Sequence, residues 1–174
     1  MDALDGIVAI VTGASSGIGE GIDKMLSVEG TKVALVARRQ NELVRVAEEI
    51  RGRGGTAFVI PADLRDEQSL RAVVEQTQNT LGPIDILVNS GGIINVSPIH
   101  EIDMQAWDAN MNINLRAPTV LCAAVLPGMR ERKKGYIINI ASEAGVFIYE
   151  QHFDQLILVT ATRIRQSTHN LSSL

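Results

Sequence analysis

The chain has 174 residues, of which 45% are hydrophobic and 21% charged, and its formal net charge is −4. This balance is typical of one soluble globular domain, and the negative charge argues against a nucleic-acid partner. No apolar run reaches the roughly 18 residues that a membrane-spanning helix needs, and the acidic residues 1–5 do not resemble a targeting segment. These features favour a cytoplasmic protein with no membrane partner.

Short apolar runs alternate with helical patterns from the start of the chain. Residues 6–11 form a β-branched run that predicts a buried strand, and a glycine-rich turn follows directly. Residues 18–29 fit a helix that Gly30 closes, and residues 32–37 predict the next strand. Together these segments make one βαβ unit.

The same alternation continues to residue 140. It predicts helices at 41–51, 66–80 and 104–130, and strands at 56–60, 84–89 and 136–140. This pattern indicates an α/β fold, a Rossmann-type doubly wound parallel sheet with helices on both faces and the strand order 3-2-1-4-5. Ligands of such sheets bind at the carboxyl ends of the strands. The fold is expected to be incomplete on its C-terminal side.

The turn at residues 12–19 has the sequence Thr-Gly-Ala-Ser-Ser-Gly-Ile-Gly between a strand and a helix. Glycines let such a backbone turn tightly and approach a pyrophosphate, while the helix N-terminus offers free N–H groups. A plain tight turn is the alternative, but the strand–turn–helix context favours dinucleotide binding. The candidate cofactor-binding residues of this turn are Gly13, Ser15, Ser16, Gly17, Ile18 and Gly19.

In the form Thr-Gly-x-x-x-Gly-x-Gly the turn resembles the classical short-chain dehydrogenase/reductase family, and the likeness continues to about Gly145. The resemblance implies an oxidoreductase that transfers hydride between a nicotinamide dinucleotide and a small carbonyl or alcohol substrate. It divides the chain into a dinucleotide-binding Rossmann domain at 1–145 and a divergent C-terminal tail at 146–174.

The second predicted strand ends at Ala37-Arg38-Arg39, where a carboxylate would bind the ribose hydroxyls of NAD(H). Arginine can pair with a 2′-phosphate instead, so NADP(H) is favoured over NAD(H). Arg38, nearest the strand, is the predicted phosphate contact. Arg39 is interpreted as a solvated charge, an interpretation that also stays open for Arg38.

Further cofactor contacts are implied by the resemblance. Asp63 stands where the family binds the adenine amino group, with Leu64 beside it, although a capping carboxylate is the alternative. Residues 89–92, Asn-Ser-Gly-Gly, replace the family pattern Asn-Asn-Ala-Gly, and they make Asn89 and Gly91 candidate cofactor contacts.

The catalytic set implied by the resemblance is incomplete. Ser142 matches the serine that polarises the substrate oxygen, and Asn114 matches the asparagine that helps to position a relay water. The family's Tyr-x-x-x-Lys is absent, because Tyr136 and Tyr149 are not followed four residues later by lysine. When residues 161–163 are aligned with the end of that motif, valine and arginine replace the tyrosine and the lysine, at positions 159 and 163.

Other interpretations stay open beside that of an enzyme. A non-catalytic nucleotide-binding or subunit-interaction protein, or a truncated inactive product, would also lack the tyrosine and lysine. A homo-oligomer is compatible with the sequence. The three histidines lie far apart without metal-ligand spacing, so no metal site is predicted. The lone Cys122 lies in an apolar run and predicts a small buried side chain rather than a disulfide, with a reactive thiol as the alternative.

Overall fold

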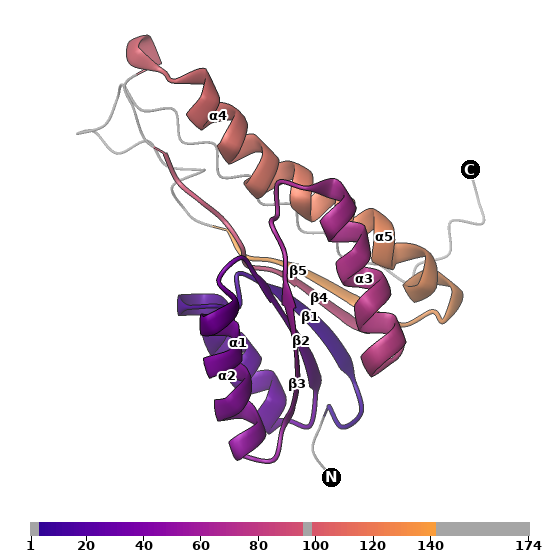
Figure 1. The fold of residues 1–174 in the computed structure, drawn as a ribbon. Helices are drawn as coiled ribbons and strands as arrows, with labels where there is room; N and C mark the ends of the chain where they lie inside the picture. The colour runs from indigo at the N-terminus through magenta and orange to yellow at the C-terminus, as the bar shows by residue number, and fades with distance from the viewer. Residues whose placement is uncertain (1–3, 96–98, 142–174) are drawn as a thin grey trace, which may run out of the picture.

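A computed structural model describes residues 4–95 and 99–141 of the chain. Five parallel strands form one sheet in the order β3-β2-β1-β4-β5 (Figure 1). The strands are β1 (Val8–Thr12), β2 (Lys32–Ala37), β3 (Thr56–Pro61), β4 (Ile86–Asn89) and β5 (Tyr136–Asn139). The strand order and the Rossmann-type fold predicted from the sequence are therefore confirmed.

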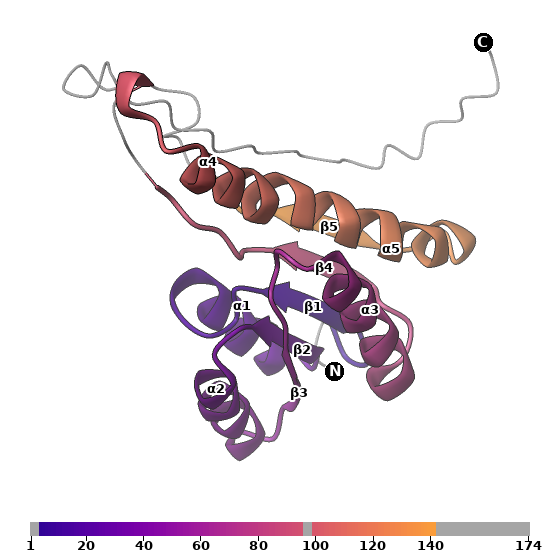
Figure 2. The same cartoon turned by 45° about the horizontal axis from the view of Figure 1, so that its top comes forward.

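Helices cover both faces of this sheet. The helices are α1 (Gly17–Val28), α2 (Gln40–Gly52), α3 (Glu67–Leu81), the 3₁₀ turn η1 (Ile99–Glu101), α4 (Met104–Met111), the π-helical segment η2 (Asn112–Arg116) and α5 (Ala117–Glu131). Helices α1 and α2 lie on one side of the sheet, and α3 lies with the α4–α5 rod on the other (Figure 2).

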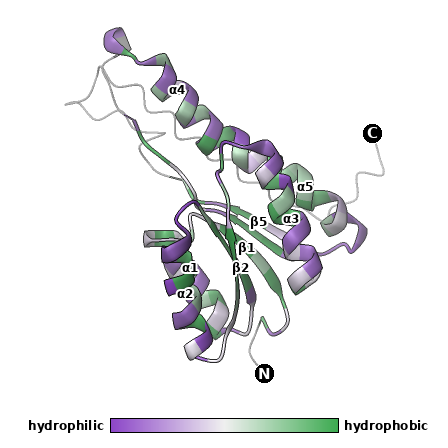
Figure 3. Ribbon diagram, viewed as in Figure 1, coloured by the Kyte–Doolittle hydropathy of each residue, from purple (hydrophilic) through white to green (hydrophobic). Residues whose placement is uncertain are grey.

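The core consists of two apolar layers that the sheet separates. Val8 and Ile10 of β1 face the layer formed with α3 and α5, whereas Ala9 and Val11 face the layer formed with α2. All five residues of β1 are buried, which is why a continuous apolar run rather than an alternating one marks this strand in the sequence. Figure 3 shows the hydrophobic strands between helices that carry both polar and apolar residues.

The helix boundaries follow from local chemistry. The Asp66 carboxylate caps α3 by accepting hydrogen bonds from the backbone N–H groups of Gln68 and Ser69. Gly30 adopts a φ of +86° just after α1, which is the left-handed conformation expected where a helix ends at glycine.

The long helix expected at 104–130 is not regular. Residues 112–116 form a π-helical segment between α4 and α5, so one helical rod contains a local change of register. Such segments are frequent at functional sites. Asn114, one of the predicted site residues, lies inside this segment.

Candidate functional site

A cleft of about 390 Å³ opens at the carboxyl ends of the strands, lined by residues from the loops after β1, β2, β3 and β4. Nine of the predicted cofactor contacts line it: Gly13, Ser15, Ser16, Ile18, Gly19, Arg38, Asp63, Leu64 and Gly91. Two others lie beside it, Gly17 as the first residue of α1 and Asn89 as the buried last residue of β4. The fold thus brings together residues far apart in the sequence.

The glycines of the first turn are required by close backbone contacts. Gly13 has a φ of +70°, and a Cβ there would lie 2.8 Å from the Cα of Gly91. A Cβ at Gly19 would collide with the backbone carbonyl of Gly13. Two loops and the start of α1 therefore approach one another more closely than any side chain allows.

Thr12 joins the first and fourth strands beneath the cleft. Its hydroxyl accepts hydrogen bonds from the N–H groups of Ser90 at 3.1 Å and Gly91 at 3.0 Å, and the residue is buried. This residue was not among the predicted contacts, although its position at the end of β1 and directly before the first glycine is a signal in the sequence.

The N-terminus of α1 lies at the cleft, which Ser16, Ile18 and Gly19 line. Ser16 precedes the helix, but its side chain makes no capping hydrogen bond to the helix. The first-turn N–H groups of an uncapped helix are free to bind an anion, and the helix dipole favours negative charge there.

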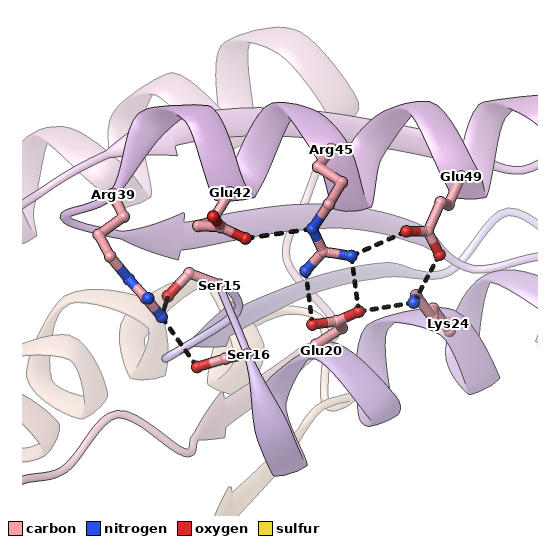
Figure 4. Close-up of polar contacts among 8 residues, drawn as sticks. All are labelled: Ser15, Ser16, Glu20, Lys24, Arg39, Glu42, Arg45 and Glu49. Atoms are coloured by element: carbon pink, nitrogen blue, oxygen red, sulfur yellow. Dashed lines mark hydrogen bonds and ion pairs between the residues drawn. The ribbon is translucent and has the colours of Figure 1, made fainter.

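Arg39 contacts the glycine-rich turn directly (Figure 4). Its guanidinium donates hydrogen bonds to the hydroxyls of Ser15 at 3.1 Å and Ser16 at 2.9 Å. Arg39 is exposed, as expected of a solvated charge, but it also bonds to the glycine-rich turn, which the sequence did not predict. Arg38 also lines the cleft, so two guanidinium groups follow β2.

Asp63 is held as a carboxylate by Arg65. The Arg65 side chain donates to both carboxylate oxygens, at 2.6 and 3.1 Å, and its backbone N–H donates at 2.9 Å. These hydrogen bonds lower the pKa of Asp63, with a smaller contribution from the charge of Arg38 and an opposing effect of burial. Asp63 is thus an ionised acceptor at the edge of the cleft.

Asn89 belongs to a buried polar group behind the cleft. Its Nδ2 donates to Oδ1 of Asn139 at 2.8 Å and approaches the sulfur of Cys122 at 3.8 Å. Cys122 packs against the α3–α5 layer of the core but is half-buried rather than buried as predicted, and this burial raises the pKa of its thiol. This arrangement ties the ends of β4 and β5 to α5.

Asn114 fixes the loop that follows β4. Its Oδ1 accepts from the N–H of Ile93 at 3.0 Å and its Nδ2 donates to the Ile93 carbonyl at 2.7 Å. Ile93 lines the cleft, so the amide of Asn114 acts on the site through the backbone of its neighbour.

Ser142, the other predicted catalytic residue, lies outside the described residues. So do Tyr149 and the two positions that replace the family's tyrosine and lysine, Val159 and Arg163. Tyr136 is described, but it begins β5 at the end of the sheet opposite the cleft and is 67% exposed. The described residues that line the cleft include neither tyrosine nor lysine.

The described part of the chain contains neither a candidate metal site nor a candidate membrane-spanning helix. No group of three His, Cys, Asp or Glu side chains in residues 4–95 and 99–141 could hold a metal ion. Within the same ranges, none of the helices has the length and hydropathy needed to cross a bilayer.

The family model and the similar proteins all point to short chain dehydrogenases. The model of the short chain dehydrogenases matches residues 7–153. A short chain dehydrogenase of Pseudocercospora fijiensis is 40% identical over 141 residues, which are 80% of this chain and 46% of that protein.

Two solved structures share the fold and part of the sequence. A metagenomic short-chain oxidoreductase in complex with NADP is 40% identical with a TM-score of 0.78, over 82% of this chain and 65% of that one. A 7α-hydroxysteroid dehydrogenase complexed with NADH and 7-oxo glycochenodeoxycholic acid is 32% identical with a TM-score of 0.81, over 84% and 57%. The chain spans about half to two thirds of the length of these proteins.

Proposed function

The chain belongs to the short chain dehydrogenase family, and on that premise we propose that it binds a nicotinamide dinucleotide in the cleft, preferring NADP(H) to NAD(H). Residues 1–145 are the proposed binding domain. The backbone of Gly13 and the uncapped start of α1 would hold the pyrophosphate, in a turn that packs too closely against Gly91 to carry a side chain at Gly13. Gly17, Ile18 and Gly19 supply N–H groups to it.

The other cofactor contacts are assigned by the strand that precedes each loop. Asp63 accepts from the adenine amino group, with Leu64 beside the ring. Asn89 and Gly91 would contact the nicotinamide half; Gly91 has no room for a side chain, because a Cβ there would collide with the side chain of Leu64. The cleft volume of about 390 Å³ lies in the range of small-molecule sites.

The observation that carries the preference for NADP(H) is the pair of guanidinium groups after β2. Arg38 and Arg39 line the cleft there, and Arg39 already bonds to the hydroxyls of Ser15 and Ser16. A 2′-phosphate fits such a group of donors, because charge-assisted hydrogen bonds to phosphate are stronger than neutral ones. The similar structures contain NADP in one case and NADH in the other, so the argument depends on these residues.

Titration of the full-length protein with NADPH, and separately with NADH, tests this proposal. Arg38→Ala and Arg39→Ala should each weaken NADPH binding by about tenfold or more, because each removes a charged hydrogen bond, and leave NADH binding nearly unchanged. Arg53→Ala is the control, because it removes an equal charge at the opposite end of α2. A folded protein that binds neither nucleotide contradicts the proposal.

For the reaction we propose hydride transfer between the cofactor and a small carbonyl or alcohol. The bound dinucleotide supplies the hydride or accepts it. Ser142 is assigned the polarisation of the substrate oxygen on its place in the sequence, and Asn114 positions the loop after β4 through Ile93. General acid–base catalysis contributes about 10² to 10⁴ in rate, and the sequence lacks the tyrosine and lysine that supply it in the family.

This gap favours a second candidate function, that of a nucleotide-binding protein without turnover. Single-turnover oxidation of bound NADPH in the presence of small aldehydes and ketones distinguishes the two. Turnover that Ser142→Ala reduces supports the enzyme. NADPH binding without turnover, unchanged in Ser142→Ala, supports the binding protein.

A further inference from the structure

Five charged side chains form one network between α1 and α2 (Figure 4). Arg45 donates to both carboxylate oxygens of Glu20, at 3.1 and 2.9 Å, and also to Glu42 and Glu49. Lys24 joins Glu20 and Glu49, with 2.6 Å to each. Every contact between α1 and α2 in this network passes through Glu20, Arg45 or Lys24.

Glu20 is the most protected member of the network. Its side chain is 17% exposed, whereas that of Arg45 is 44% exposed. Hydrogen bonds from Arg45 and Lys24 lower the pKa of Glu20 to about 2, so the carboxylate stays ionised under ordinary conditions. A single exposed ion pair stabilises little, but a two-pronged arginine–carboxylate contact shared by several charges imposes a defined geometry.

The network lies directly behind the cleft. Ser16 precedes α1 and Glu20 lies in its first turn, while Arg39 precedes α2 and Arg45 lies farther along the same helix. Two contacts therefore lie one after the other where α2 faces α1 and the turn before it: Arg39 with the turn, and Arg45 with Glu20 (Figure 4). The second contact joins α1 to α2 within the first two turns of each helix.

We propose that Glu20 and Arg45 are positioning residues, which hold Arg39 against Ser15 and Ser16 and thereby set the preference for a dinucleotide that carries a 2′-phosphate. This inference rests on the proposed binding of NADP(H) and extends it to residues that do not line the cleft. Their effect reaches the ligand through Arg39.

An electrostatic role and a positioning role of Glu20 predict opposite changes in the affinity for NADPH. Glu20→Gln removes a negative charge close to the phosphates, so an effect through the electric field alone would tighten NADPH binding. Loss of positioning instead loosens the contact of Arg39 with the turn and weakens NADPH binding. The sign of the change therefore separates the two effects.

The experiment measures NADPH and NADH dissociation constants for the full chain, Glu20→Gln, Arg45→Met, Arg39→Met and the two double variants with Arg39→Met. Glu67→Gln is the matched control, because Glu67 is also a first-turn glutamate bound by an arginine, Arg71, but on the opposite face of the sheet. Thermal unfolding of each variant confirms that it is folded.

We expect Glu20→Gln and Arg45→Met each to lower the preference for NADPH over NADH by about three- to tenfold, with Glu67→Gln unchanged. In the Arg39→Met background neither substitution should change the preference further, since the residue on which they act is gone. A purely structural role would lower the unfolding temperature and leave the preference unchanged.

The possible failures can be told apart. A wild-type chain that binds both nucleotides equally overturns the proposed preference for NADP(H). A wild-type preference that Arg39→Met abolishes and Glu20→Gln leaves intact or increases overturns the positioning role alone. Equal effects of Arg45→Met with and without Arg39 also overturn it.

Discussion

The side-chain amide of Asn114 makes two hydrogen bonds with the backbone of Ile93: its Oδ1 accepts from the N–H at 3.0 Å, and its Nδ2 donates to the carbonyl at 2.7 Å. Asn114 lies in the π-helical segment between α4 and α5, and Ile93 lies in the loop after β4. The side chain of Asn114 thus joins the helical rod to one wall of the cleft.

Asn114→Ala is expected to destabilise the protein by about 1–3 kcal/mol, because it leaves a partly buried N–H and carbonyl without partners. It should also weaken nucleotide binding, since the loop after β4 loses its anchor. Urea unfolding and NADPH titration measure the two effects.

Asn110→Ala is the control for this prediction. Asn110 lies one turn earlier and also bonds to the loop after β4, through Asn95, but that contact is exposed. Equal losses in both variants would show that Asn114 has no special part in the cleft.

A second prediction compares two glycines of α1. A Cβ at Gly19 would collide with the carbonyl of Gly13, whereas a Cβ at Gly21 meets no atom within 4 Å. Gly19→Ala should therefore destabilise the protein by about 1–3 kcal/mol and weaken nucleotide binding. Gly21→Ala should stabilise it by about 0.5–1 kcal/mol, because alanine favours a helix interior. The same change in stability for both variants would refute the close contact.

A third prediction concerns the hydroxyl of Thr12, which accepts from the N–H groups of both Ser90 and Gly91. Thr12→Val keeps the shape but removes the acceptor, so it should cost about 1–3 kcal/mol of stability. Thr12→Ser keeps the acceptor and should change stability less. Unfolding in urea with NADPH present and absent shows whether the loop and the nucleotide site depend on the same contact.

Much of the fold could be predicted because the three central strands, β2, β1 and β4, are buried on both faces and read as continuous apolar runs. Residues 32–37 were identified in full as β2, and the edges of the other elements differ by one or two residues. The first and fourth strands begin later than expected, at Val8 and Ile86, since the apolar residues before them extend beyond the paired register. An apolar residue is expected to be buried, but this does not show that it is hydrogen-bonded to a neighbouring strand.

The π-helical segment could not be predicted, because the apolar spacing continues across residues 104–130 while the change of register depends on the packing of the rod. The glycine turn, Asp63 and Arg38 were found because they are adjacent to strand ends in the sequence. Arg39 and Thr12 were missed as site residues, since their partners Ser15, Ser16, Ser90 and Gly91 come from other loops. Which loops contact one another depends on how the strands are arranged in the folded sheet.

The last prediction concerns Asp23, which lies in α1 with no exposed surface. Neither of its carboxylate oxygens has a hydrogen-bond partner within the described residues. Burial, with a smaller contribution from the charge of Glu20, raises its pKa well above the ordinary range. The folded state therefore favours the protonated form of Asp23 more than the unfolded chain does.

The sign of the pH dependence follows from this proton. The folded state holds it and the unfolded state loses it above the ordinary aspartate pKa, so the free energy of unfolding falls as pH rises from there through the raised pKa of Asp23. Glu20 acts in the opposite direction and at lower pH, because its pKa is lowered to about 2 and its contribution is lost only on acidification. The two effects therefore occupy separate pH ranges.

Asp23→Ala should make the protein more stable near neutral pH, by about 1–3 kcal/mol, because it removes a buried group without partners. It should also flatten the decline of stability as the pH rises above the ordinary aspartate pKa, which urea unfolding across a pH series measures. Asp108→Ala, at an exposed aspartate of α4, is the control and should leave the decline unchanged. A wild-type chain as stable at the upper pH as at the lower one would mean that Asp23 is charged and partnered in solution, and α1 would then have to pack differently on the sheet.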